Sequence, residues 1–243
     1  MIEADRLAHA SRWRGLPLAE KALLSLGLLA LAMALPPWPG SAMVLVVASL
    51  CAWRAGTGTG AWVRLLAVPL AFVLTGAATL LVQVGPDGPT WAEGGVPQAA
   101  RLALRATAAA AALLLLAVTT PMAALVQGLR RLGLPADLAE LVLVIYRFIF
   151  VLLDTASAMH ASQVARLGGD GWRRRVRSTS LLAAALWPRA LDRARRLEVG
   201  LAARGFDGAL PTLAAGPPVA ARPWRLLAVL SGLMALTGVS LWI

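Results

Sequence analysis

The sequence has few of the residues that build disulfides and metal sites. Among its 243 residues there is one cysteine, Cys51, and there are two histidines, His9 and His160. A single cysteine excludes an intrachain disulfide, and two histidines cannot by themselves form a four-ligand transition-metal site. We therefore expect this chain to bind no metal ion and no other cofactor.

Lysine is almost absent as well, since Lys21 is the only one and no Gly-x-x-x-x-Gly-Lys motif occurs. A P-loop needs that lysine to reach the phosphates of a nucleotide. If ATP drives this protein, another chain must hydrolyse it. An intramembrane enzyme is a further alternative, but the polar candidates Gln83, Thr75 and Thr107 are isolated in sequence and are more typical of hydrogen bonds between helices. We expect a non-catalytic protein.

Charge is scarce and apolar residues are abundant. Only 14% of the residues are charged and 59% are hydrophobic, which is too apolar for an ordinary soluble domain and typical of a multi-span membrane protein. We predict an all-α integral membrane protein with about five transmembrane helices, or six, and long cytoplasmic amphipathic helices. The predicted parts are an N-terminal membrane domain at 1–120, a coupling domain at 121–222 and a C-terminal transmembrane helix at 223–243.

Five apolar runs account for the predicted spans. The tight turn Pro36 to Gly40 separates the first two, because its prolines cannot continue a helix. Positions 108–112 of the fourth run are alanine-rich, which allows neighbouring helices to approach closely. The runs are Ala22 to Leu35, Ala42 to Trp53, Trp62 to Val84, Ala99 to Thr120 and Trp224 to Ile243.

Basic residues set the expected orientation. Arg54 and Arg64 fall on one side of the predicted spans, whereas the loop from Gly85 to Val96 holds acids and no basic residue. Under the positive-inside rule this predicts a multi-pass protein of the cell (inner) membrane with a cytoplasmic N-terminus. A signal peptide is the rival interpretation of the start, but no convincing small-x-small site follows Leu35.

The positive charge is concentrated in the second half. Between Pro121 and Arg225 lie 15 of the 23 basic residues and 7 of the 12 acidic ones. Such a bias indicates a cytoplasmic surface in contact with anionic membrane lipid. A nucleic-acid surface would need lysines and aromatic platforms on a soluble domain, so we expect membrane lipid and no nucleic acid among the partners.

Three helices are predicted in this basic half. Met122 to Leu132 is amphipathic and is expected at the membrane interface. Leu138 to Leu153 is apolar but contains Arg147, which would cost roughly 2.5 to 3.5 kcal/mol at the bilayer centre. We interpret it as a helix packed on protein, and a short span remains the alternative. Trp172 to Ala203 is amphipathic, and Pro188 is expected to kink it.

The second and third of these helices end alike, with an Ala-Arg pair just before glycines. The ends read Ala165-Arg166-Leu167-Gly168-Gly169 and Ala203-Arg204-Gly205. Glycine adopts the left-handed conformation that closes a helix, and the arginine presents a planar fork of donors suited to a carboxylate or to carbonyls. A single such arginine is explained by capping of its own helix. Two of them, on consecutive basic helices, favour docking to a partner.

These motifs resemble the T component of energy-coupling-factor (ECF) transporters, specifically the cobalt type called CbiQ. The resemblance covers nearly the whole chain. It rests on Asp5-Arg6-Leu7-Ala8, Thr119-Thr120-Pro121, Leu129-Arg130-Arg131-Leu132-Gly133, Tyr146-Arg147-Phe148 with Asp154, Leu191-Asp192-Arg193-Ala194, and Ala202-Ala203-Arg204-Gly205-Phe206-Asp207-Gly208.

The resemblance implies a scaffold that couples two ABC ATPase subunits to a substrate-binding membrane S component (CbiM-like) in cobalt uptake. It implies ATPase docking by the ends of the two helices, with Leu167 standing where the family has glycine. The expected docking residues are Ala165, Arg166, Leu167, Ala203, Arg204 and Gly205. A platform for the substrate-binding subunit is expected on the helices themselves, at Arg147, Trp172, Leu186, Leu191, Leu197 and Leu201.

Other functions stay open at this point. Nickel-type and vitamin-type T components share the architecture. A conventional ABC permease would contain its own substrate pathway and would need one coupling loop rather than two arginine ends. A lipid-bound structural protein would use the basic face and would need no ATPase.

Overall fold

The computed structural model describes residues 3–85, 88–166 and 171–205, together with isolated positions between 224 and 238. Its contacts divide the chain into two units, Met1–Gly128 with Ala215–Ile243, and Leu129–Ala214. The predicted limits of the coupling domain, at 121 and 222, stay predictions.

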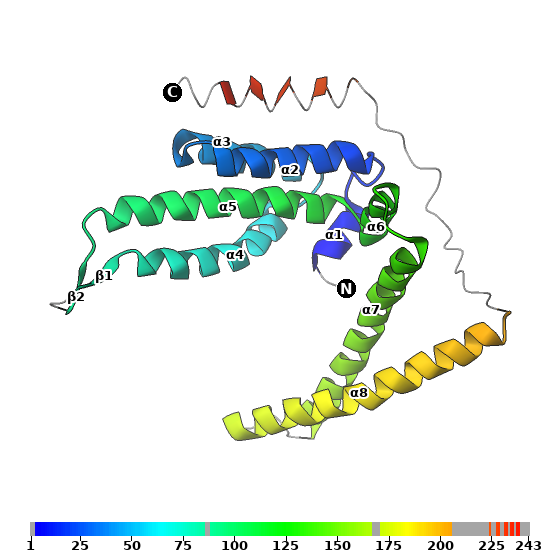
Figure 1. Ribbon diagram of the computed structural model, residues 1–243. Coiled ribbons are helices and arrows are strands. Elements are labelled where there is room, and N and C mark those ends of the chain that lie inside the picture. The colour runs from blue at the N-terminus through cyan, green and yellow to red at the C-terminus, as the bar shows by residue number, and fades with distance from the viewer. Residues whose placement is uncertain are drawn as a thin grey trace. The chain divides into compact units, whose positions relative to one another are not determined.

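Helices dominate the described residues (Figure 1). Their order is α1 (Glu3–Ala10), α2 (Leu18–Ala34), the short helical turn η1 (Pro37–Ser41), α3 (Ala42–Arg54), α4 (Thr59–Thr79), β1 (Val82–Gly85), β2 (Gly88–Trp91), α5 (Gly95–Thr119), α6 (Met122–Arg131), α7 (Ala136–Ala165) and α8 (Trp172–Ala202). Two of them, α4 and α5, are long and apolar enough to cross a membrane. The predicted class, an all-α membrane protein, is confirmed.

The predicted third span is wrong at its C-terminal end. The helix ends at Thr79 rather than continuing to Val84, and the chain forms an antiparallel hairpin that pairs Val82 with Trp91. In Val82-Gln83-Val84 apolar and polar residues alternate, which favours a strand, but the apolar run before it masks this short pattern.

The other predicted spans differ in how fully they are formed. The first two correspond to α2 and α3, which have 17 and 13 residues and are shorter than the roughly 20 residues that a perpendicular span needs. The predicted turn at Pro36 to Gly40 is confirmed, because Trp38 has an extended backbone (φ −122°, ψ 126°) that interrupts the helical geometry of η1. The expected last span, Trp224 to Ile243, lies mostly outside the described residues.

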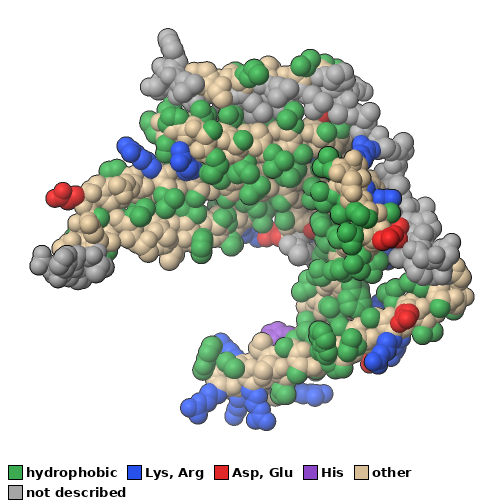
Figure 2. All heavy atoms as spheres, viewed as in Figure 1, with side chains coloured by type: hydrophobic (Ala, Val, Ile, Leu, Met, Phe, Trp, Pro, Cys, Tyr) green, Lys and Arg blue, Asp and Glu red, His purple; other side chains and the backbone are tan. Residues whose placement is uncertain are grey.

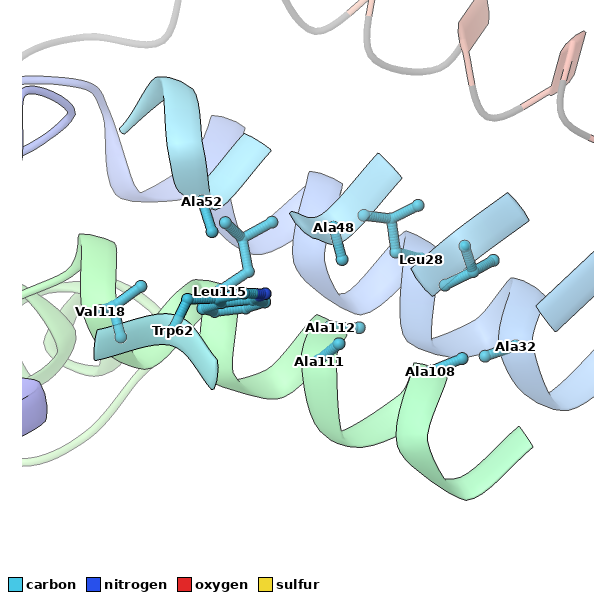
Figure 3. Packing of buried hydrophobic residues seen from close by; sticks show 11 residues of the cluster. Leu28, Ala32, Ala48, Ala52, Trp62, Ala108, Ala111, Ala112, Leu115 and Val118 are labelled. Atoms are coloured by element: carbon cyan, nitrogen blue, oxygen red, sulfur yellow. The ribbon is translucent and has the colours of Figure 1, made fainter. Parts of the chain in front are cut away.

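Helix α5 forms the centre of the first unit. It contacts α1, α2, α3 and α4, and its alanines at 108, 111 and 112 are fully buried (Figure 3). Leu28 of α2, Ala48 of α3 and Trp62 of α4 belong to the same cluster. The close approach predicted for the alanine-rich face is confirmed, and small side chains make it possible because they let helix backbones come together.

Polar contacts join α2 to α5 at both ends and in the middle. Near one end Lys21 Nζ donates to the backbone oxygen of Thr119 at 3.1 Å, and near the other Arg105 Nη2 donates to the oxygen of Leu35 at 2.9 Å. Ser25 Oγ donates to the oxygen of Ala112 between them. These partners make the two helices antiparallel. Each cation lies where the last carbonyls of a helix carry partial negative charge.

Helix α6 is amphipathic, as predicted. Val126 is buried, whereas Arg130 and Arg131 are exposed. Gly128 lies so close to Leu18 of α2 that a Cβ atom at this position would overlap the leucine side chain. Helix α6 therefore packs closely, at Gly128, on the N-terminal end of α2.

Candidate functional site

Helix α7 presents a continuous apolar stripe. Its large exposed apolar side chains recur every three or four residues, which places them on one face of the helix. They are Leu138, Leu141, Ile145, Ile149 and Leu153. On another face Tyr146 and Phe150 meet edge to face, with ring centroids 5.0 Å apart and an interplanar angle of 88°. The sequence predicted one long helix here, and the helix indeed continues to Ala165.

Helix α8 follows α7 and packs against it within the second unit (Figure 1). Between Trp172 and Ala190 the half-buried positions of α8 recur at helical spacing, at Ser178, Leu182, Ala185, Leu186 and Ala190. Gln163 Nε2 of α7 donates to the backbone oxygen of Ser178 at 3.1 Å. The helix continues through Pro188. Most of the side chains of α8 are exposed, which leaves its surface accessible to other subunits.

The two helices enclose a groove of about 440 Å³, here called the arginine groove. It is lined by Val144, Arg147, Phe148, Val151, Arg193, Leu197, Gly200, Leu201 and Arg204. Three guanidinium groups thus lie along an apolar floor, and none of these lining residues is acidic. An arginine in such a place offers its donors to an incoming carboxylate or carbonyl.

The C-terminal ends of α7 and α8 are solvent-exposed. Arg204 follows the last helical turn, with its backbone N–H bonded to the oxygen of Leu201 at 3.0 Å. Gly205 has φ +70°, the left-handed conformation expected for a glycine that closes a helix. Arg166 ends α7 with its N–H bonded to the oxygen of Gln163 at 3.1 Å. Leu167, Gly168 and Gly169 lie outside the described residues.

The structure brings together only part of the predicted set. Arg147, Leu197, Leu201 and Arg204 line the arginine groove. The remaining predicted residues lie elsewhere: Leu186 is half-buried, Trp172, Leu191 and Ala203 are exposed on α8 or at its end, and Ala165 and Arg166 are exposed at the end of α7. The predicted assignment of these residues to docking and to the platform stays a prediction.

Sequence reasoning missed the groove itself. Arg147, Phe148 and Val151 follow Val144 by three, four and seven residues, which is the spacing of positions on one face of a helix. The same holds for the α8 residues from Arg193 to Arg204. The signal was present, but it becomes visible only when the two helices are considered as a facing pair.

A second basic surface lies at the start of α8. Figure 2 shows Lys and Arg side chains gathered at this end of the helix. The residues are Arg173, Arg174, Arg175 and Arg177, all exposed. These exposed guanidinium groups give the start of α8 a positive potential, which attracts anionic groups outside the chain.

Comparison with known proteins identifies the family. The family model described as "CbiQ: Cobalt transport protein" matches residues 10–213. The chain belongs to the CbiQ family. It is 49% identical over 243 residues to a protein named "Cobalt transport protein CbiQ" from Rhodobacter capsulatus, with 98% of each chain covered.

Two further relatives extend this result. A protein of the same name from Salmonella typhimurium is 31% identical over 221 residues, covering 86% of this chain and 98% of that protein. A "Putative fused cobalt transport protein CbiMQ" from Methanocorpusculum labreanum is 30% identical over 159 residues, covering 60% of this chain and 26% of that protein. The relatives are thus named as transport proteins, in agreement with the membrane fold.

Proposed function

We propose that this chain is the transmembrane scaffold subunit, or T component, of an ECF importer for cobalt ions. It would couple ATP hydrolysis by two partner ATPases to a separate substrate-binding membrane subunit. Membership of the CbiQ family supports the cobalt substrate. We further propose that the chain catalyses no reaction and holds no cofactor, because its single lysine, Lys21, follows Glu20 and lies in no P-loop motif, and the ion would be bound by the partner subunit.

The observation that carries this proposal is the position of Arg204. It is exposed, it follows the last turn of α8, and its neighbour Gly205 has the left-handed conformation that closes a helix. An ATPase carboxylate or carbonyl can approach such a side chain without displacing the helix. Arg166 offers a similar exposed end on α7. In the proposal each arginine engages one ATPase.

The arginine groove suggests how movement of the ATPases reaches the rest of the chain. Arg204 shares this groove with Arg147 and Val151 of α7, so a displacement of the end of α8 also changes what α7 contacts. Rigid helices transmit such a displacement over their whole length. We propose that the two helices move as a pair when the ATPases close and open.

A CbiM-like subunit is the proposed substrate-binding partner. A relative whose name joins CbiM and CbiQ in one fused protein supports this pairing, because fusion keeps together chains that act together. The exposed stripe of α7 from Leu138 to Leu153 is an apolar surface of the kind that another membrane helix covers. The platform proposed from the sequence would extend from this stripe onto α8.

We also propose a multi-pass location in the cell membrane with a cytoplasmic N-terminus. The long apolar helices α4 and α5 support the membrane location. The basic second half supports the orientation, because cytoplasmic segments retain arginine. The same surface would contact anionic lipid, and no nucleic-acid partner is proposed.

Cobalt uptake by the complete transporter tests the proposal. Arg204→Glu reverses the charge at the proposed contact and should abolish ATP-dependent uptake while the amount of protein in the membrane is unchanged. Arg189→Glu is the matched control, because Arg189 is exposed on α8 and does not line the arginine groove. Normal uptake with Arg204→Glu, or equal loss with both variants, would refute the docking role.

A further inference from the structure

A second pocket lies in the first unit, where α3 ends and α4 begins. It has a volume of about 420 Å³ and is here called the α3–α4 pocket. Its lining residues are Arg12, Trp53, Arg54, Gly56, Thr57, Gly58 and Thr59. The proposed coupling function uses none of them.

Two arginines supply the charge of this pocket. Neither Arg12 nor Arg54 has a carboxylate partner within the part of the chain that the structure describes, and no lining residue is acidic. Nearby Arg64 differs, because its guanidinium lies 3.2 Å from the carboxylate of Glu3. The pocket therefore holds positive charge that the described chain does not neutralise.

The backbone fixes Arg12 beside the loop. Its N–H donates to the oxygen of Ala55 at 2.9 Å, and Ser11 Oγ donates to the same oxygen at 3.1 Å. The Arg12 side chain then crosses Gly56, whose φ of +92° suits glycine. A Cβ atom on Gly56 would meet Arg12 Cγ at 3.5 Å, so the side chain packs directly over this turn.

The hydroxyl group of a buried threonine and the N–H groups at the start of α4 complete the pocket. Thr57 is only 4% exposed, and its side chain makes no hydrogen bond within the described residues. The first N–H groups of any helix lack partners inside the helix, and Gly58, the N-cap of α4, provides no side-chain cap. Residues that carry guanidinium, hydroxyl and N–H donors thus line one small volume, a combination that suits a phosphate group.

The location of the pocket indicates which phosphate it takes. It lies at the first turn of α4, one of the two helices among the described residues that are long and apolar enough to span a membrane. Trp53 lines it and is 64% exposed, as tryptophans at the headgroup level of a bilayer are. On the same face of α4 as Thr59, the exposed side chains Val63, Leu70 and Leu74 lead away from the pocket along the helix.

We propose that the α3–α4 pocket binds the headgroup phosphate of an anionic phospholipid, with an acyl chain lying along the Val63, Leu70 and Leu74 face of α4. The two arginines and the Thr57 hydroxyl bind the phosphate. The apolar face favours a lipid over a free anion, because inorganic phosphate has no acyl chain that could pack against it. The bound lipid would contact the N-terminal segment, α3 and α4 and would hold all three at the headgroup level of the membrane.

Native mass spectrometry of the full-length protein in detergent tests this inference. The probes are phosphatidylglycerol, phosphatidylcholine of the same acyl chains, and inorganic phosphate. The wild type should retain one phosphatidylglycerol, about tenfold more tightly than phosphatidylcholine, because an anionic lipid pairs with both arginines. Equal retention of the two lipids, or binding of inorganic phosphate as tight as that of the lipid, would overturn the proposal.

Variants localise the binding. Arg12→Gln with Arg54→Gln should weaken phosphatidylglycerol binding about tenfold or more. Arg6→Gln with Arg14→Gln removes the same charge from exposed residues outside the pocket and should change it less than about twofold. Equal weakening by both double variants would mean that the overall positive charge attracts the lipid, and it would contradict a defined site.

A third variant keeps both charges. Thr57→Val preserves the shape of the buried side chain, removes only its hydroxyl and should still weaken phosphatidylglycerol binding measurably. Thermal unfolding shows whether each variant is folded. If the Arg12→Gln, Arg54→Gln double variant is unfolded, the test rests on Thr57→Val. Unchanged phosphatidylglycerol binding by this folded variant would overturn the proposal.

Discussion

Enlarging one alanine at the centre of α5 should destabilise the first unit, whereas the same change on the exposed side of the helix should not. Ala112 is fully buried and belongs to the cluster that contains Leu28 and Ala48. Ala117 lies on the same helix and is exposed. Replacing each by leucine adds three carbon atoms to the same helix in two different surroundings.

The expected magnitudes follow from the packing. A leucine at Ala112 has no space between α5 and its neighbours, and overpacking of this kind costs about 1 to 3 kcal/mol. In a chain of this size each kcal/mol lowers the unfolding midpoint by about 2 to 4 °C, so the fall should be about 2 to 12 °C. Ala117→Leu should change the free energy of unfolding by no more than about 0.5 kcal/mol.

Thermal unfolding of both variants in the same detergent measures the difference. Tryptophan fluorescence follows it well, because Trp62 is buried in this cluster. A midpoint for Ala112→Leu equal to that of Ala117→Leu would refute the close packing of α5 against α2 and α3.

Two further predictions concern the second unit. Gly205→Ala should weaken co-purification with ATPases, because φ +70° is unfavourable for alanine by about 1 kcal/mol. Gly76→Ala, on α4 outside the arginine groove and with open space around it, should leave co-purification intact, and equal effects would contradict a role for the turn. A cysteine replacing the exposed Arg177 in a Cys51→Ser background should react with an impermeant maleimide only from the cytoplasmic side, and labelling from outside would overturn the proposed orientation.

Long periodic segments were predictable from the sequence. The long helix to Ala165 and the one from Trp172 were predicted nearly to their ends, because apolar periodicity and terminal glycines mark such helices clearly. The alanine-rich face of α5 was predicted for the same kind of reason, since small residues have one obvious use between membrane helices.

Features that depend on contacts distant in sequence could not be predicted in this way. Lys21 is 98 positions from Thr119 along the chain, so its hydrogen bond to that residue has no local pattern. The β hairpin after Thr79 was missed because four-residue strands give a weak signal beside a long apolar helix. The arginine groove needs two facing helices, and only their packing brings Arg147 near Arg204.

Co-purification of ATPases with this chain tests the coupling account most directly. The wild type and an Arg166→Ala, Arg204→Ala double variant would be solubilised under conditions in which membrane complexes survive, with Arg173→Ala, Arg189→Ala as the matched control of exposed α8 arginines. The account predicts that ATPase subunits elute with the wild type and the control but not with the double variant. Retention of the ATPases by the double variant, or their absence from the wild type, would contradict it and leave the two arginines as caps of their own helices.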